Sequence, residues 1–181
     1  MGKIFVISDT HFYHSMVIRE KYRDFRTVDI MNEVMINNWN RTVGKEDTVY
    51  HLGDVCIGSY RKFKADVLPL LNGNIIFVRG NHDSKSLTKV CAIKMEFQGK
   101  TFELVHSPEN ASFNTDYIIH GHIHNAKSRT GIYLKRKCYN CIVELHNYKP
   151  KLINEILGEL NNCNWFDKMT LEDINYRSML R

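Results

Sequence analysis

The sequence predicts an α/β protein with two stacked mixed β-sheets and helices on the outside. Two observations support this fold class. In the first half of the chain, short apolar runs alternate with helical patterns in the order β, α, β, α, β, which indicates a sheet with helices on its faces. In the second half, short strand patterns follow one another with turn signals between them, which indicates further sheet.

In the first half, the continuous apolar run Ile4–Ile7 is typical of a strand buried on both faces. Thr27 or Asp29 can cap a helix that ends near Gly44. That helix carries large apolar residues at helical spacing, namely Met31, Val34, Met35 and Trp39. The pattern continues with a strand over 47–52, a helix over 60–71 and a strand over 75–78.

In the second half, strands at 92–97 and 101–105 flank Gln98-Gly99-Lys100, which is a hairpin signal. Further short strands are expected at 117–119, 131–134 and 141–145. A closing helix is expected over 152–160, where apolar residues recur at helical spacing. Residues 164–181 are weakly patterned, so we expect one domain over 1–163 and a C-terminal extension, either a short helix or a tail.

Composition agrees with one globular domain, because the 181 residues are 43% hydrophobic and 25% charged. The net charge of +5 suits a phosphate-bearing partner without demanding nucleic acid. No secretory or membrane-spanning segment is visible and the cysteines number five, so we expect a reduced, cytoplasmic protein that binds no membrane. Cys138 and Cys141 are expected to be reduced thiols, because no second pair at zinc-site spacing follows them.

Polar groups that can bind metal ions follow five of the expected strands. They are Asp9 with His11, His51 to Asp54, Arg79 to Asp83, His106, and His120 to His124. Ligands of open α/β sheets bind beyond the carboxyl ends of the strands. Each block alone is more simply a turn, a helix cap or a packed histidine, but all five in this order indicate one site.

Asp, Asn and His together suit Mn, Fe, Zn or Co better than Mg or Ca, which prefer oxygen ligands alone. The blocks supply too many ligands for a single tetrahedral ion. Two ions about 3.5–4 Å apart, with one carboxylate bridging them, would use the whole set.

The blocks Asp9-x-His11, Gly53-Asp54, Gly80-Asn81-His82-Asp83, His106 and Gly121-His122-x-His124 resemble the signature of the calcineurin-like metallophosphoesterase superfamily. All five stand in the family's order. The stretches ISDTHFYH, VYHLGDV and HNYKP are similar to a subgroup of small, single-domain bacterial and phage phosphoesterases, which extends the resemblance to about residue 150. The family fold that this resemblance implies is a four-layer α/β/β/α sandwich.

The resemblance also implies roles for single residues. One divalent transition-metal ion is bound by Asp9, His11 and His124, the other by Asn81, His106 and His122, and Asp54 bridges both. His82 is not a ligand in this family; it points at the substrate phosphate and helps the leaving oxygen. Manganese is the first expectation for both ions, with iron, zinc, nickel or cobalt as alternatives.

The implied activity is hydrolysis of a phosphate mono- or diester by in-line attack of a hydroxide that bridges the two ions. Asn81 and His82 would meet the charge that develops on the phosphoryl oxygens. The main alternative is a nuclease acting on DNA or RNA. A non-catalytic binding protein on the same fold, such as the retromer subunit, ranks lower because that reading predicts eroded ligands.

Several residues lie outside this pattern. His14 either reaches the substrate side, one helical turn beyond His11, or is a surface residue at a helix start; Arg79 is a second candidate for substrate contact. His51 is expected to be structural, and His120 to pack or to support a ligand. Many relatives carry an acidic residue shortly after Gly-Asp that orients the catalytic histidine, whereas here Val55-Cys56-Ile57-Gly58 follows and only Asp83 adjoins His82.

Overall fold

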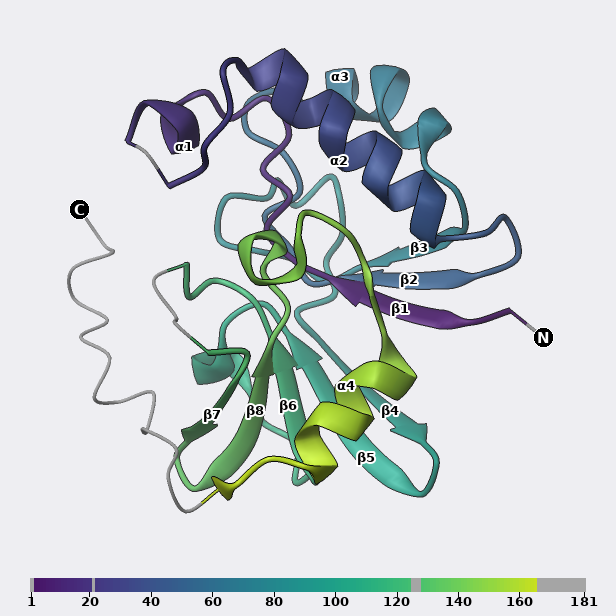
Figure 1. Ribbon diagram of the computed structural model, residues 1–181, viewed down its shortest axis with the longest axis vertical. Helices are drawn as coiled ribbons and strands as arrows, with labels where there is room; N and C mark the ends of the chain where they lie inside the picture. Colours follow the sequence, from purple (N-terminus) through teal and green to yellow (C-terminus); the bar gives the residue numbers. More distant parts are fainter. Residues whose placement is uncertain (1, 21, 125–127, 166–181) are drawn as a thin grey trace.

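Two β-sheets stacked face to face form the centre of the protein (Figure 1). The computed structural model describes residues 2–20, 22–124 and 128–165. The first sheet has the strand order β3-β2-β1-β9, and the second has the order β4-β5-β6-β8-β7. This arrangement confirms the fold class that the sequence predicts. Most of the expected C-terminal extension, from residue 166 onward, lies outside the described residues.

The first sheet contains three parallel strands, β1 (Ile4–Ile7), β2 (Thr48–His51) and β3 (Asn74–Phe77). The short β9 (Lys151–Leu152) pairs antiparallel to β1. Because the three parallel strands are in register, their carboxyl ends meet at one edge of the sheet. The helices α2 (Val28–Thr42) and α3 (Tyr60–Asp66) lie over the outer face of this sheet (Figure 1).

The second sheet begins with the hairpin of β4 (Ala92–Phe97) and β5 (Lys100–Val105). The next two strands, β6 (Tyr117–His120) and β8 (Arg136–Asn140), run parallel to β5, and β7 (Thr130–Tyr133) pairs antiparallel to β8. The carboxyl ends of β5 and β6 therefore also share one edge.

The prediction of a strand over 141–145 is wrong. The basic stretch Arg136–Asn140 forms β8 instead, and Val143–His146 forms the short 3₁₀ helix η3. The β7–β8 hairpin turns at Leu134 and Lys135, whose φ angles are 45° and 64°. Arg136 gains a partner inside the fold, since its guanidinium donates to Oε2 of Glu103 at 2.6 Å. Val143 of η3 is still buried, so the apolar pattern did not distinguish a strand from a short buried helix.

The expected helix over 60–71 is divided into α3, which ends at Asp66, and the 3₁₀ helix η1 (Leu68–Leu70). Pro69 lies in the first turn of η1, and its missing N–H cannot continue the hydrogen bonds of α3. Of the two candidate caps of α2, Thr27 is the one used, because its hydroxyl oxygen accepts from the backbone N–H of Ile30 at 3.2 Å. The remaining helices are α1 (Met16–Arg19), η2 (Pro108–Asn110) and α4 (Ile153–Asn161).

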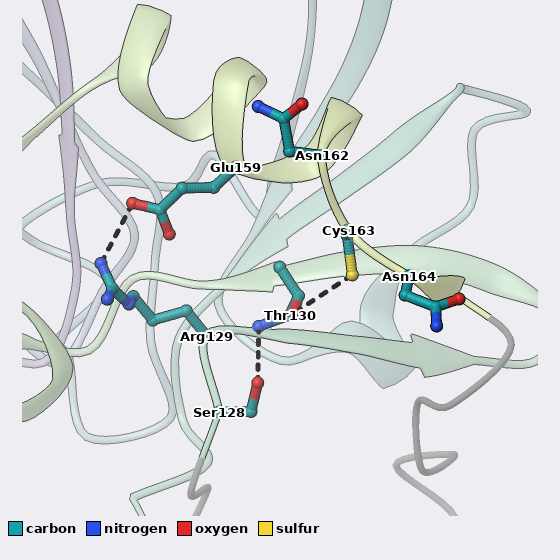
Figure 2. A pocket seen from close by; sticks show the side chains of 7 residues that line it. All are labelled: Ser128, Arg129, Thr130, Glu159, Asn162, Cys163 and Asn164. Atoms are coloured by element: carbon teal, nitrogen blue, oxygen red, sulfur yellow. Dashed lines mark hydrogen bonds and ion pairs between the residues drawn. The ribbon is translucent and has the colours of Figure 1, made fainter.

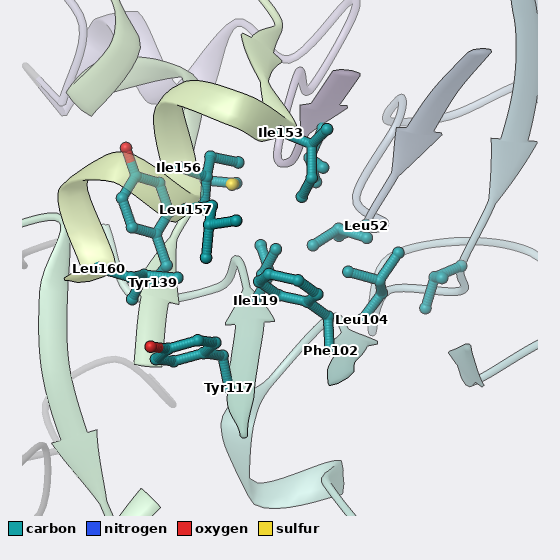
Figure 3. Packing of buried hydrophobic residues seen from close by; sticks show 13 residues of the cluster. Leu52, Phe102, Leu104, Tyr117, Ile119, Tyr139, Ile153, Ile156, Leu157 and Leu160 are labelled. Atoms are coloured by element: carbon teal, nitrogen blue, oxygen red, sulfur yellow. The ribbon is translucent and has the colours of Figure 1, made fainter. Parts of the chain in front are cut away.

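The largest apolar cluster joins both sheets to α4 (Figure 3). The buried face of α4 consists of Ile153, Ile156, Leu157 and Leu160, as the helical spacing predicts. Figure 3 shows this face beside Phe102 and Ile119 of the second sheet, with Leu52 from the end of β2 close by. Burial of these side chains holds the sheets together just below the edge where the strands end. None of the helices among the described residues is both long and apolar enough to cross a membrane.

Candidate metal centre

The carboxyl ends of the two sheets meet, and hydrogen bonds join them. The backbone N–H of Ser8 donates to the carbonyl oxygen of Cys141 at 2.9 Å. The ring Nδ1 of His106 lies 2.9 Å from the carbonyl oxygen of Leu52. Each of the five polar blocks therefore leaves its strand toward the same place, as the strand-end pattern predicts. All seven expected metal ligands are described, and they form two adjacent groups.

The first group consists of Asp9, His11 and His124, whose ligand atoms all lie within 4.8 Å of one another. Oδ1 of Asp9 is 3.7 Å from Nε2 of His11 and 3.3 Å from Nε2 of His124. This buried oxygen accepts no hydrogen bond of normal geometry within the described parts of the chain. A buried carboxylate oxygen that faces two imidazole nitrogens without a donor fits the chemistry of a metal ligand.

The second group consists of Asp54, His106 and His122, whose ligand atoms also lie within 4.8 Å of one another. Oδ1 of Asn81 joins it, 2.8 Å from Nε2 of His106. Oδ2 of Asp54 is 3.5 Å from Nε2 of His106 and 3.7 Å from Nε2 of His11. The same carboxylate oxygen thus faces both groups, which is the position that a bridging ligand requires.

Electrostatic interactions within the first group shift two pKa values in opposite directions. Burial alone would raise the pKa of Asp9, but the imidazoles of His106, His11 and His124 hold it well below its usual value. Burial alone would lower the pKa of His124, but the nearby carboxylates of Asp9 and Glu144 raise it to about 10. The centre therefore favours a negative charge at Asp9 and a positive charge where His124 lies.

The backbone is strained at four of the expected ligand residues. Their φ angles lie in the left-handed region: 60° at Asp9, 49° at His11, 53° at Asp54 and 70° at His122. A left-handed backbone costs roughly 1–2 kcal/mol at each residue other than glycine. Such strain persists only where surrounding contacts hold it, and it gathers at functional sites.

Two glycines of the blocks allow this close approach. A Cβ added at Gly80 would lie 2.2 Å from Oδ1 of Asp54. One added at Gly121 would lie 2.0 Å from Oγ of Ser8 and 2.2 Å from Oδ2 of Asp9. Both glycines are therefore needed because Asp54, Ser8 and Asp9 occupy the space that a side chain would fill.

His82 lies at the open rim of the two groups. Its side chain is 52% exposed, and its Nε2 is 4.0 Å from Oδ2 of Asp54. Its backbone N–H donates to Oδ1 of Asp54 at 2.9 Å, which fixes the start of its side chain. This placement agrees with a residue that faces substrate, whereas Asn81 beside it lies among the ligands.

Asp83, the sequence neighbour of His82, has its hydrogen-bond partners elsewhere. Its carboxylate accepts the backbone N–H groups of Asp54, Val55 and Gly80 at 2.7, 2.9 and 2.8 Å. It therefore joins the loops that follow β2 and β3 and holds the backbone of Asp54 in place.

Of the additional residues, His14 lies on the exposed side of the first group. Its Nδ1 is 3.2 Å from Nδ1 of His11, and its ring centroid is 6.5 Å from that of His82. Burial and the two neighbouring imidazoles lower the pKa of His14 to about 4. This position agrees with the substrate-side alternative. Arg79 is half-buried, and its role in phosphate contact stays a prediction.

His51 and His120 are both buried, as their expected supporting roles require. Nε2 of His51 lies 2.9 Å from Oγ1 of Thr10, and burial lowers the pKa of His51 to about 3. Nδ1 of His120 lies 2.8 Å from the carbonyl oxygen of Gly121, directly before the ligand His122.

Sequence reasoning missed Arg23 and Glu144. The Arg23 side chain is fully buried and pairs with Oε1 of Glu144 at 2.8 Å, and the same oxygen lies 3.0 Å from Nδ1 of His124. Glu144 is acidic within an otherwise apolar stretch, which was the one available signal. Arg23 lies in a loop among other charged residues, so the sequence carries no signal for its role.

Comparison with known proteins agrees with this geometry. The model of the calcineurin-like phosphoesterase superfamily domain matches residues 3–135. An uncharacterized protein from Methanocaldococcus jannaschii is 43% identical over 162 residues, which cover 87% of this chain and 90% of that protein. A protein of unknown function from Aquifex aeolicus has a similar crystal structure, with a TM-score of 0.70, 26% identity, and coverage of 87% of this chain and 99% of that one.

Similarity to an Escherichia coli phosphoesterase, YfcE, is weaker: 17% identity with a TM-score of 0.43, over 76% of this chain and 78% of that one. The family match spans more than half of the chain and contains every expected ligand block. The chain belongs to the calcineurin-like phosphoesterase superfamily.

Proposed function

We propose that the protein is a dinuclear metal-dependent phosphoesterase that hydrolyses a phosphate mono- or diester. The observation that carries the proposal is the pair of adjacent ligand groups that share Oδ2 of Asp54. Asp9, His11 and His124 would hold one ion, Asn81, His106 and His122 the other, and Asp54 both. When bound, two such ions would offset the negative charge of the ester and lower the pKa of a water molecule between them.

The residues at the rim have separate tasks in this proposal. His82, half exposed beside Asp54, would donate a proton toward the leaving oxygen. The Asn81 amide would help to orient the phosphoryl group, and His14 would contact substrate from the other side of His11. The ring Nδ1 of His106 donates to a carbonyl oxygen, which can only accept, so its Nε2 is left for a metal ion.

The mixed nitrogen and oxygen donors support a transition metal, and manganese is our first choice before iron, zinc, nickel or cobalt. A phosphate ester of a small molecule or a nucleotide is the proposed substrate. A reducing compartment such as the cytoplasm is the proposed location. A nuclease stays the alternative activity. The retained ligand set weighs against a non-catalytic binding protein.

The test is an activity panel with Mn²⁺: an aryl phosphate monoester, an aryl diester, cyclic nucleotides, and single-stranded DNA and RNA. We expect turnover on at least one substrate, and its complete loss in Asp54→Ala because that change removes a ligand of both ions. Asp116→Ala is the matched control, since Asp116 is 41% exposed and lies at the other end of β6. No turnover that depends on Asp54 would support the binding-protein alternative.

A second variant tests the role of His82. His82→Ala should lower turnover while metal content, measured by elemental analysis, stays near the wild-type value. If His82→Ala and Asp54→Ala lose metal to the same extent, then His82 is a ligand and the proposed division of roles is wrong.

A further inference from the structure

A buried ion pair lies directly behind the first ligand group. Arg23 and Glu144 are 121 positions apart in the sequence, yet Nε of Arg23 is 2.8 Å from Oε1 of Glu144. The Arg23 side chain is 0% exposed and that of Glu144 is 15% exposed. Desolvation of two charges can outweigh their attraction, so a buried pair is weak evidence of a contribution to stability alone. Its contacts indicate a more specific role.

Glu144 contacts the ligand histidine of the first group. Its Oε1 accepts from Nε of Arg23 and also lies 3.0 Å from Nδ1 of His124. An ionised carboxylate only accepts hydrogen bonds, so Nδ1 of His124 carries a proton. Nε2 of His124, which faces Oδ1 of Asp9 at 3.3 Å, is then the nitrogen left to bind a metal ion.

Arg23 contacts the backbone that presents the other two ligands. Its Nη2 donates to the carbonyl oxygen of Asp9 at 2.6 Å, and its Nη1 donates to that of Thr10 at 2.8 Å. Asp9 and His11, on either side of Thr10, both have left-handed φ angles. Arg23 thus stabilises the strained segment between β1 and the first ligand histidine.

We propose that Arg23 and Glu144 are positioning residues that set the geometry and metal affinity of the Asp9–His11–His124 group. This inference rests on the metal centre of the proposed function. The second group has its own supports: the carbonyl oxygen of Leu52 holds His106, and Asp83 holds the backbone of Asp54. Loss of the Arg23–Glu144 pair should therefore weaken metal binding by the first group far more than by the second.

The experiment is calorimetric titration of the metal-free full chain with Mn²⁺, for which the wild type should show two binding events. The event that weakens in Asn81→Ala is assigned to the second group. Glu144→Ala should weaken the other event by about 10–100-fold, the usual effect of removing a partner of a ligand histidine. Glu144→Gln should recover part of this loss, because its amide oxygen can still accept from Nδ1 of His124.

Glu159→Ala is the matched control. Glu159 of α4 pairs with Arg129 at 3.0 Å, and Figure 2 shows this pair in a pocket that lies between the C-terminal end of α4 and the residues leading into β7. Its carboxylate also accepts from the hydroxyl of Tyr139 at 2.9 Å. Loss of this second ion pair should lower the melting temperature without changing either Mn²⁺ affinity, which separates general destabilisation from ligand positioning.

A double variant, Arg23→Met with Glu144→Leu, removes both charges together. It replaces Glu144→Ala in the titration if that variant does not fold. It should show the same selective loss at the first group. Unchanged Mn²⁺ affinity in the Glu144 variants, equal losses at both sites, or no recovery by Glu144→Gln would refute the positioning role. Failure of the wild type itself to bind Mn²⁺ would instead refute the metal centre of the proposed function.

Discussion

Gly121→Ala is expected to disturb the metal centre from the side of β6. The added methyl group would lie 2.0 Å from Oγ of Ser8, 2.2 Å from Oδ2 of Asp9 and 2.6 Å from Cβ of Ser8. Real contacts of a Cβ stay beyond 3.0 Å, so these atoms must move by about 1 Å. Ser8 and Asp9 are both 0% exposed, which leaves them no solvent to move into.

The magnitude follows from overpacking of a buried site. We expect a loss of about 1–3 kcal/mol in the free energy of unfolding, which for a chain of this size lowers the melting temperature by about 2–12 °C. The effect on function should be larger, because a displacement of about 1 Å in a catalytic group can cost about 10²-fold in rate. Thermal unfolding, Mn²⁺ titration and hydrolysis of the best aryl ester measure the three effects.

Gly158→Ala is the control for this substitution. An added Cβ at Gly158, inside α4, would meet nothing within 4 Å. Alanine in a helix interior is favoured over glycine by roughly 0.5–1 kcal/mol, so this variant should be more stable and equally active. Wild-type Mn²⁺ affinity and activity in Gly121→Ala would refute the argument that Gly121 is needed to keep Asp9 in position.

Three further predictions concern the supports of the fold. Asp83→Ala leaves three backbone N–H groups without their acceptor and should lower the free energy of unfolding by about 3–6 kcal/mol; an unchanged denaturation midpoint would contradict this. Burial lowers the pKa of His146, whose Nε2 donates to the carbonyl oxygen of Asn140, to about 4. The unfolded chain therefore takes up a proton first as pH falls below about 6.5, and stability falls until about pH 4. His146→Gln should remove about 2 kcal/mol of the stability difference between pH 7.5 and pH 5 in guanidinium unfolding, and an identical pH dependence would show that His146 is not the group concerned. Thr27→Ala removes the cap of α2 and should cost about 1 kcal/mol, whereas Thr27→Ser should cost less.

The sequence predicted which polar residues gather at the strand ends, because their signal is local. Asp9, His11 and Asp54 come directly after apolar strands, and the carboxyl ends of parallel strands share an edge. The prediction of a strand at 141–145 failed because the local pattern there is ambiguous. Buried apolar residues there serve a short helix equally well, and pairing with β6 and β7 selected the basic stretch Arg136–Asn140 instead.

The supports of the site were not predictable in the same way. Arg23 and Glu144 meet across 121 positions, and no spacing rule links them. Asp83 looked like a neighbour of His82, but its carboxylate accepts backbone N–H groups of two other loops. Ligand types are visible in a sequence as residues, whereas the contacts that orient them depend on loops that only the tertiary structure brings together.

The strained backbone connects these supports to the energetics of the centre. Left-handed conformations at Asp9, His11, Asp54 and His122 together cost about 4–8 kcal/mol, which is comparable to the whole net stability of a typical domain. Apolar burial between the sheets and α4 must offset that cost, since the same place also gathers four imidazoles around two carboxylates. The fold itself therefore holds these side chains together. In the proposed metal centre, they would bind their ions with little rearrangement, because the cost of ordering them is met during folding.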